Sequence, residues 1–144
     1  MAKRENNTTD DLMNKLEEAA SLERFLREDV HVLPPFDLYV EQLCLDRGEK
    51  REHVIKRAAI DRTYGHQLFN GTRKPSRDKV IQLAFGFGLD VEETQQLLRA
   101  AQKSPLYPRI KRDAAIIYCI IHGLQVADAQ QMLSGFNLPV LGSQ

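Results

Sequence analysis

The sequence predicts an all-α protein. Apolar residues recur at intervals of three and four along most of the chain, which is the spacing that gathers them on one face of a helix. Glycines and prolines separate these stretches at the places where helices are expected to end. Residues 116–121 are rich in isoleucine, which favours strands. They lie inside a segment of helical length, however, and no second segment is a strand candidate that can pair with them. With 144 residues, the chain is expected to form about one compact domain.

The N-terminal region, residues 1–34, predicts an acidic amphipathic helix. Asp10 and Asp11 can cap its exposed backbone N–H groups, and leucines follow at helical spacing at positions 12, 16, 22 and 26. Pro34 and Pro35 cannot continue a helix, so they mark the end of the region as a linker. Five basic and eight acidic side chains give these residues a net charge of −3.

Five helices are expected in the central region, residues 35–104. Their expected bounds are 36–47, 51–58, 61–70, 76–87 and 90–101. Side chains suited to N-caps precede the last three of them, at Asp61, Ser76 and Asp90. Glycines suited to helix ends follow the first, third and fourth, at Gly48, Gly71, Gly86 and Gly88. The second and third helices are short and meet across a tight connection.

The C-terminal region, residues 105–144, predicts a helical hairpin. Prolines at 105 and 108 bracket a turn, and helices are expected at 109–122 and 126–134. The first of these is apolar on nearly every side, so it is expected to lie centrally or in a subunit interface. The hairpin is therefore expected to pack on the central region or to form a dimer interface.

A net charge of zero conceals a basic segment. Residues 47–79 contain ten basic and four acidic side chains, a net charge of +6, so the rest of the chain sums to −6. Such a segment is typical of phosphate binding, although runs of surface charge often only solvate helix faces.

The helix expected at residues 61–70 carries hydrogen-bonding side chains on one face. Arg62, His66 and Asn70 recur four residues apart, and Thr63 and Gln67 lie beside them. Arginine can pair with the N7 and O6 atoms of guanine, glutamine can pair with adenine, and threonine offers a hydroxyl and a methyl group. This face therefore suits a DNA major groove.

Residues 51–76 resemble a known DNA-binding motif. Their sequence is REHVIKRAAIDRTYGHQLFNGTRKPS, and its most specific part is GTRKPS at residues 71–76, followed by an apolar helix and by GLD at residues 88–90. The segment is similar to the helix-turn-helix of the lambda-repressor-like domains, the Cro/CI or XRE family. The resemblance covers roughly residues 36–101. It implies a five-helix core, to which this chain adds an N-terminal helix and a C-terminal helix pair.

The resemblance also implies roles for individual residues. The helix from Arg51 would support the helix from Asp61 in the major groove. Together with the helix face described above, it implies base contacts by Arg62, Thr63, His66, Gln67 and Asn70. Phosphate contacts are implied for Arg51, Arg73 and Lys74. Arg51 stands where the family commonly has a glutamine that touches the DNA backbone.

Three positions depart from the family pattern. Ile55 replaces a small alanine, Ala59 replaces the glycine of the turn, and Gly65 replaces an inward aliphatic residue. A glycine inside a helix costs about 1 kcal/mol relative to alanine and removes a packing side chain. Tyr64, Phe69 or Ile55 can fill the space. A larger Ile55 opposite a smaller Gly65 would keep the core volume nearly constant, so we predict one compensated exchange.

The predicted function is that of a sequence-specific DNA-binding transcriptional regulator that reads double-stranded DNA with the helix at 61–70. Such regulators usually bind as two-fold dimers, and the helix around 116–121 or the N-terminal helix would supply the homodimer interface. The alternative hypothesis is a protein-interaction adaptor that keeps the repressor-like fold, with a protein partner bound through the N-terminal helix. In an intramolecular version, residues 10–29 would cover the basic face.

Neither an enzyme nor a metal or cofactor site is predicted. Ser76 and Lys79 fit an S-x-x-K pattern, but the companion motifs of that enzyme class are missing, and the four histidines do not occur at metal-ligand spacing. Cys44 and Cys119 are expected to be buried free thiols. Because the sequence has no signal-peptide core and no apolar run of about 18 residues, we expect a cytoplasmic protein without a membrane partner.

Overall fold

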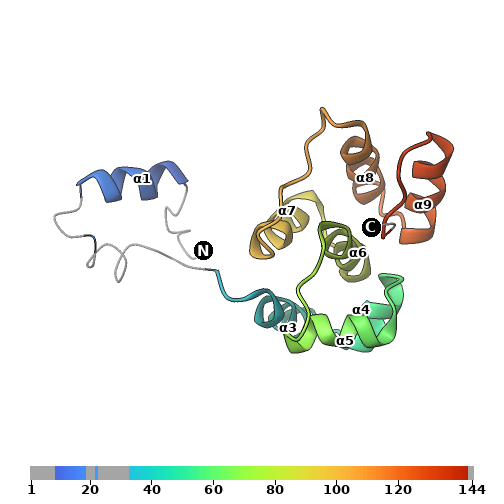
Figure 1. Ribbon diagram of the computed structural model, residues 1–144, viewed down its shortest axis with the longest axis horizontal. Helices are drawn as coiled ribbons and strands as arrows, with labels where there is room; N and C mark the ends of the chain where they lie inside the picture. Colours follow the sequence, from blue (N-terminus) through green and yellow to red (C-terminus); the bar gives the residue numbers. More distant parts are fainter. Residues whose placement is uncertain (1–8, 19–21, 23–32, 143–144) are drawn as a thin grey trace. The chain divides into compact units, whose positions relative to one another are not determined.

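The computed structural model describes residues 9–18, 22 and 33–142 (Figure 1). Every regular element among these residues is an α-helix, which confirms the all-α prediction. The chain divides into two units, Met1–Leu33 and Pro34–Gln144. The predicted C-terminal region therefore belongs to the same unit as the central region.

The first unit contains helix α1, Thr9–Glu18. Asp10 and Asp11 lie in its first turn, where negative charge is favourable because the N-terminal end of a helix dipole is positive. Met13 and Leu16 are exposed. Leu26 and half of residues 10–29, which were proposed to cover the basic face, lie outside the described residues.

Seven helices form the second unit. They are α3 (Phe36–Arg47), α4 (Arg51–Arg57), α5 (Arg62–Asn70), α6 (Arg77–Phe87), α7 (Val91–Ala100), α8 (Lys111–Ile121) and α9 (Val126–Gly135). Each predicted boundary agrees with the structure to within two residues.

The predicted caps explain why these boundaries could be found. The Asp61 carboxylate accepts a hydrogen bond from the Tyr64 N–H at 3.1 Å, and the Ser76 hydroxyl accepts one from the Lys79 N–H at 3.3 Å. Asp90 forms a capping box with the residue three positions on. Glycines at 48, 71 and 88 take the left-handed conformation at the ends of α3, α5 and α6.

Gly86 does not end a helix, which corrects the sequence-based expectation. It lies inside α6, where a Cβ atom would come within 2.5 Å of the Val54 carbonyl oxygen and 3.0 Å of the Ala58 Cβ. The absence of a side chain therefore allows α4 and α6 to cross closely. The Arg57 Nε also donates to the Gly86 carbonyl oxygen at 2.9 Å.

Helix α6 forms the centre of the second unit. It packs against α4, α7 and α9, and Val80, Ile81 and Leu83 on it are fully buried. The hairpin of α8 and α9 joins this core through α7 and α6 (Figure 1). Cys44 and Cys119 are both free and buried, as predicted. Burial raises the pKa of the Cys44 thiol to about 11 and also raises the pKa of the Cys119 thiol, so both stay neutral at pH 7.

Helix α8 packs on one side only. Ile116 and Cys119 are buried, whereas Tyr118 and Ile121 are 49% and 66% exposed. Of the two expected places for this helix, a central position fits only one face, and the other face leaves apolar side chains exposed. None of the described helices combines the length and the apolar content needed to span a membrane.

Candidate nucleic-acid interface

Helices α4 and α5 are joined by a turn of four residues, 58–61. Ala59 has φ 56°, the left-handed conformation in which the family pattern has glycine. The Ile60 N–H then donates back to the Ile55 carbonyl oxygen at 3.2 Å, and Ile60 is buried. Asp61 begins α5. The two helices therefore meet across a tight turn, as predicted, and Ala59 in this turn has a strained backbone conformation.

The five predicted base-contacting residues lie on the side of α5 away from the core. Arg62, Thr63 and Asn70 are exposed, and His66 and Gln67 are half-buried. We call these five residues the reading face. The opposite side of α5 is buried through Gly65, Leu68 and Phe69.

Ile55 of α4 fills the space beside Gly65. A Cβ on Gly65 would meet three carbons of the Ile55 side chain at 2.5 to 2.9 Å. The Ile55 side chain therefore lies in the space that a side chain at position 65 would take, as the predicted exchange requires.

Arg51, a predicted phosphate contact, is bound within the domain. Its Nη1 donates to the Asn70 Oδ1 at 3.0 Å, and its Nη2 pairs with the Glu41 carboxylate at 2.5 Å. The guanidinium also lies 5.3 Å from the centre of the Phe69 ring. Arg51 therefore links α3, α4 and α5, and it occupies the amide oxygen of one reading-face residue. Sequence reasoning did not identify Glu41.

The loop after α5 folds back onto the helix. The Arg73 Nε donates to the Gln67 Oε1 at 2.8 Å, and the Arg73 guanidinium lies 4.6 Å from the centre of the Tyr64 ring. Lys79 lies 5.4 Å from the same ring. Tyr64 therefore gathers two cations beside the reading face by cation–π attraction. The sequence had indicated only that Tyr64 is one of three side chains that can fill the space beside Gly65. Lys74 follows Arg73 in the same loop and is exposed.

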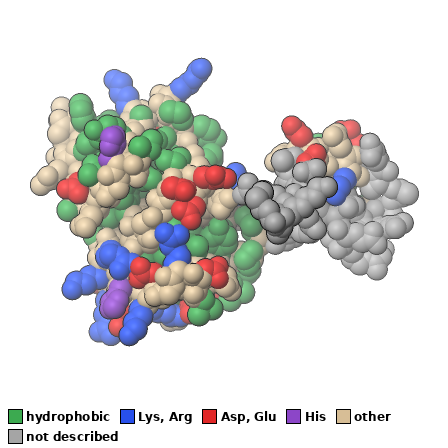
Figure 2. All heavy atoms as spheres, turned by 180° about the vertical axis from the view of Figure 1, so that it is seen from behind, with side chains coloured by type: hydrophobic (Ala, Val, Ile, Leu, Met, Phe, Trp, Pro, Cys, Tyr) green, Lys and Arg blue, Asp and Glu red, His purple; other side chains and the backbone are tan. Residues whose placement is uncertain are grey.

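Ion pairs reduce the basic segment to part of its apparent charge. Four of its ten cations pair with carboxylates, as Arg47–Glu93, Arg51–Glu41, Arg57–Glu49 and Arg77–Asp113. The other six have no carboxylate partner in the part of the chain that the structure describes: Lys50, Lys56, Arg62, Arg73, Lys74 and Lys79. Figure 2 shows Lys and Arg side chains gathered over the α4 and α5 end of the domain, at the lower left.

A hollow of about 270 Å³ lies beside the start of the reading face. Its lining consists of Glu52, Ile55, Lys56, Ile60, Arg62 and His66. The two isoleucines give it an apolar floor next to two predicted base contacts. Among the groups exposed in a major groove, the thymine methyl is the one that apolar surface recognises.

One further residue at this site was not predicted. Gln82 of α6 is buried, and its Nε2 donates to the carbonyl oxygens of Ala58 and Ala59 at 3.1 and 3.4 Å. It therefore holds the turn between α4 and α5. A polar residue amid the apolar residues of α6 was the only indication in the sequence.

Comparisons of the chain with protein-family models, with curated proteins and with solved structures found no match. The described residues also contain no group of three His, Cys, Asp or Glu side chains that can hold a metal ion. The candidate site therefore consists of residues of α4, α5 and the loop that follows.

Proposed function

We propose that the protein is a sequence-specific DNA-binding transcriptional regulator with a lambda-repressor-like helix-turn-helix. The observation that carries this proposal is the reading face on α5. It presents five hydrogen-bonding side chains, and cations without carboxylate partners among the described residues flank it. This combination provides base readout beside charge that attracts phosphates.

Each part of the interface has a distinct role in the proposal. Arg62 and Gln67 would select bases, because their side chains can make paired hydrogen bonds to guanine and adenine. Arg73 and Lys74 would bind phosphates and fix the register of the protein on the duplex. The cation–π contact with Tyr64 supports this role, since it holds Arg73 in place before DNA arrives.

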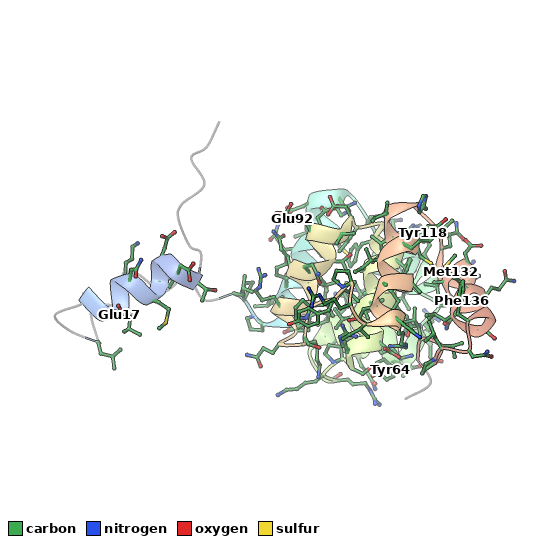
Figure 3. The ribbon with its side chains drawn as sticks, turned by 90° about the horizontal axis from the view of Figure 1, so that it is seen from above. Glu17, Tyr64, Glu92, Tyr118, Met132 and Phe136 are labelled. Atoms are coloured by element: carbon green, nitrogen blue, oxygen red, sulfur yellow. The ribbon has the colours of Figure 1, made fainter. Side chains whose placement is uncertain are left out.

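We also propose that the regulator is a homodimer. A surface with very few charges supports this, because residues 114–144 include a single charged side chain, Asp128. Tyr118, Ile121 and Phe136 are exposed on this surface. Figure 3 shows Tyr118, Met132 and Phe136 along the edge formed by α8 and α9, away from Tyr64. Exposed apolar surface of this kind commonly marks an interface.

Light scattering at micromolar concentration tests the dimer. We expect twice the chain mass of 16.5 kDa for the wild type and a single chain mass for Ile121→Asp. Leu45→Asp is the matched control, because Leu45 is 71% exposed on α3 and lies outside this surface. A monomeric wild type overturns the dimer and leaves the DNA proposal standing.

The second candidate function is a protein-interaction adaptor. The same apolar surface on α8 and α9 favours it, as does the binding of two reading-face amides by Arg51 and Arg73. In this case the fold would present protein-binding surfaces, with weak or no affinity for DNA.

Selection of bound duplexes from a random pool separates the two functions. A regulator enriches one sequence, and Arg62→Ala changes the enriched sequence, whereas an adaptor enriches none. Arg109→Ala is the matched control, because Arg109 is exposed outside the α4 and α5 region. If no duplex shifts in mobility at low salt, the DNA proposal fails and the adaptor becomes the leading function.

A further inference from the structure

The turn between α4 and α5 is held by a side chain from a third helix. Gln82 of α6 is 3% exposed, and its amide nitrogen contacts the carbonyl oxygens of Ala58 and Ala59. These carbonyls lie at the end of α4, where no later residue of the helix can bind them. The strained Ala59 follows at the same point. The direction in which α5 leaves α4 therefore depends on a contact with α6.

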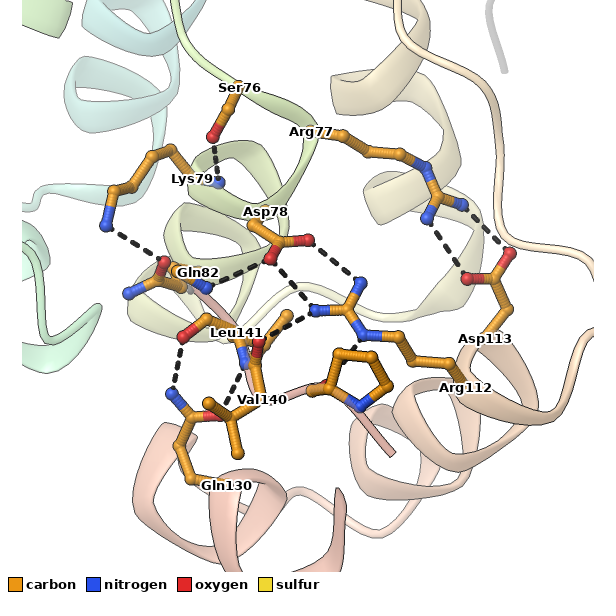
Figure 4. A network of polar contacts seen from close by, with 12 residues as sticks. Ser76, Arg77, Asp78, Lys79, Gln82, Arg112, Asp113, Gln130, Val140 and Leu141 are labelled. Carbon is orange, nitrogen blue, oxygen red and sulfur yellow. Dashed lines mark hydrogen bonds and ion pairs between the residues drawn. The ribbon is translucent and has the colours of Figure 1, made fainter. Parts of the chain in front are cut away.

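A short segment near the C-terminus covers Gln82. We call residues 139–142 the C-terminal strap. The Gly142 N–H donates to the Asp78 carboxylate at 3.0 Å, and a Cβ on Gly142 would lie 3.1 Å from the Gln82 Oε1. Lys79 approaches the same Oε1 at 3.4 Å. The strap thus lies against the amide that holds the turn (Figure 4).

Two side chains of the C-terminal hairpin fix the strap. Arg112 of α8 donates to the carbonyl oxygens of residues 139 and 140, at 2.8 and 3.1 Å, and binds both oxygens of Asp78 at 2.9 Å. Gln130 of α9 exchanges two hydrogen bonds with the backbone of Leu141, at 2.7 and 2.9 Å. Hydrogen bonds therefore run from α8 and α9 to the strap and from the strap to Asp78 (Figure 4), and Gly142 of the strap lies beside the Gln82 amide that binds the turn.

We infer that Gln82 is a positioning residue for the reading helix α5, and that the C-terminal strap keeps it in place. As far as DNA is concerned, the inference rests on the proposed function. Base recognition is more sensitive to this position than phosphate binding is, because base contacts need a defined geometry and mobile cations can follow the backbone charge.

Three substitutions of glutamine by methionine test the inference. Gln82→Met keeps the length of the side chain and removes the donor to the turn, and Gln130→Met releases the strap from α9. Gln95→Met is the matched control. Gln95 of α7 exchanges two hydrogen bonds with the Leu106 backbone, at 2.9 and 2.8 Å, in the same manner as Gln130, but among the described residues it has no hydrogen bond with the strap or the turn.

The first measurement is amide hydrogen exchange in the full chain without DNA. We expect Gln82→Met to speed exchange at Ile60 about tenfold relative to Tyr39 of α3, because the carbonyls of Ala58 and Ala59 lose their donor and the turn opens more often. Gln130→Met is expected to change the ratio in the same direction by a smaller factor. Gln95→Met is expected to leave it unchanged.

The second measurement compares a duplex selected by the wild type with a scrambled duplex. Gln82→Met is expected to lower affinity for the selected duplex about tenfold more than affinity for the scrambled one, with an unchanged salt slope. A purely structural role would lower both equally. That result overturns the positioning role in DNA recognition.

The exchange data can overturn the inference independently of DNA. The inference fails if Gln82→Met leaves the ratio of the Ile60 exchange rate to the Tyr39 exchange rate unchanged. It also fails if Gln95→Met raises this ratio as much as Gln82→Met does. If Gln130→Met leaves this ratio of exchange rates unchanged, the strap does not keep Gln82 in place, and only the positioning role of Gln82 itself remains. If the wild type binds no duplex at all, the proposed function fails, and exchange at Ile60 alone decides whether Gln82 positions α5.

Discussion

The Ile55 side chain occupies the volume that a side chain on Gly65 would need. Three of its carbons lie 2.5 to 2.9 Å from the position that a Cβ on Gly65 would take. The contact joins α4 to α5 at their crossing. Both departures from the family pattern at this crossing are thus two halves of one packing arrangement.

This arrangement predicts a strong coupling between the two positions. Gly65→Ala is expected to destabilise the domain by about 1 to 3 kcal/mol, because the clash with Ile55 outweighs the better helix propensity of alanine. Ile55→Ala alone is expected to cost about 2 to 5 kcal/mol through the cavity it leaves. The double variant should lose clearly less than the sum, because the new methyl group enters that cavity. Urea unfolding of the four proteins measures the coupling.

A glycine in open space provides the control for Gly65. Gly135 ends α9, and a Cβ there would have no atom within 4 Å. Gly135→Ala is therefore expected to leave stability unchanged or to raise it by up to about 1 kcal/mol. Additive effects of Gly65→Ala and Ile55→Ala would contradict the packing relationship.

Ala59 predicts a stabilising substitution in the turn. Its φ of 56° lies in the left-handed region, which costs residues with a Cβ roughly 1 to 2 kcal/mol. Ala59→Gly removes this strain, and the greater freedom of glycine in the unfolded chain offsets part of the gain. We expect a net stabilisation of about 0.5 to 1 kcal/mol by thermal or urea unfolding.

The neighbouring alanine is the control for that substitution. Ala58 has φ −73° and is buried, so Ala58→Gly has no strain to remove and is expected to destabilise the domain. If both glycine variants lower stability, Ala59 is not strained in solution.

Local chemistry explains why the helices of the second unit were predictable. Asp61, Ser76 and Asp90 cap their helices through bonds to residues three positions away, so nearby sequence contains the whole signal. The exchange between Ile55 and Gly65 was also predictable, because the resemblance already placed the two positions opposite each other. For the caps the partner lies three positions away in the sequence, and for Gly65 the sequence narrowed the choice to three side chains that included Ile55.

Contacts between distant segments were not predictable in the same way. Glycine is typical of helix ends, yet Gly86 lies inside α6. Its lack of a side chain allows a close approach to Val54, which is 32 positions earlier. Arg77 counts as a cation of the basic segment, yet both of its Nη atoms bind Asp113. Gln82 has no local signal for its contact with the turn. A single sequence does not reveal which distant residues come into contact, so the roles of Gly86, Arg77 and Gln82 could be identified only from the structure.

Asp78 predicts how stability depends on pH. Burial by itself raises the pKa of this carboxyl, but hydrogen bonds from Arg112 and Gly142 and the charges of Arg112 and Arg77 more than offset it, so the pKa is lowered. A lowered folded pKa contributes stability that is present above the unfolded value of about 3.9 and is lost as pH falls through the folded value. The free energy of unfolding should therefore fall below about pH 4.

The contribution of Asp78 can be separated from that of other carboxylates. Asp78→Asn cannot ionise, so its unfolding free energy should be lower at pH 7 and should fall less steeply below about pH 4 than that of the wild type. Asp10→Asn is the control, because Asp10 is exposed on α1 and should retain the wild-type slope. Parallel curves for Asp78→Asn and the wild type would contradict the assignment.

The proposed DNA interface predicts that the loss of Lys74 and the loss of Gln67 weaken DNA binding in different ways. Lys74 has no carboxylate partner among the described residues and follows the loop that Tyr64 helps to hold, so it is expected to bind phosphate. Lys74→Ala should weaken binding to all duplexes alike and reduce the slope of log affinity against log salt by about 1.

Gln67→Ala should keep the slope and relax the preference at one base pair, at a cost of about 1 to 3 kcal/mol for the preferred sequence. The Gln67 amide oxygen accepts from Arg73, so this variant also frees a cation, and affinity for scrambled duplexes should not fall. Mobility shifts at several salt concentrations, with the selected and a scrambled duplex, distinguish these patterns. A uniform loss in both variants would mean that α5 binds DNA by charge alone and reads no sequence.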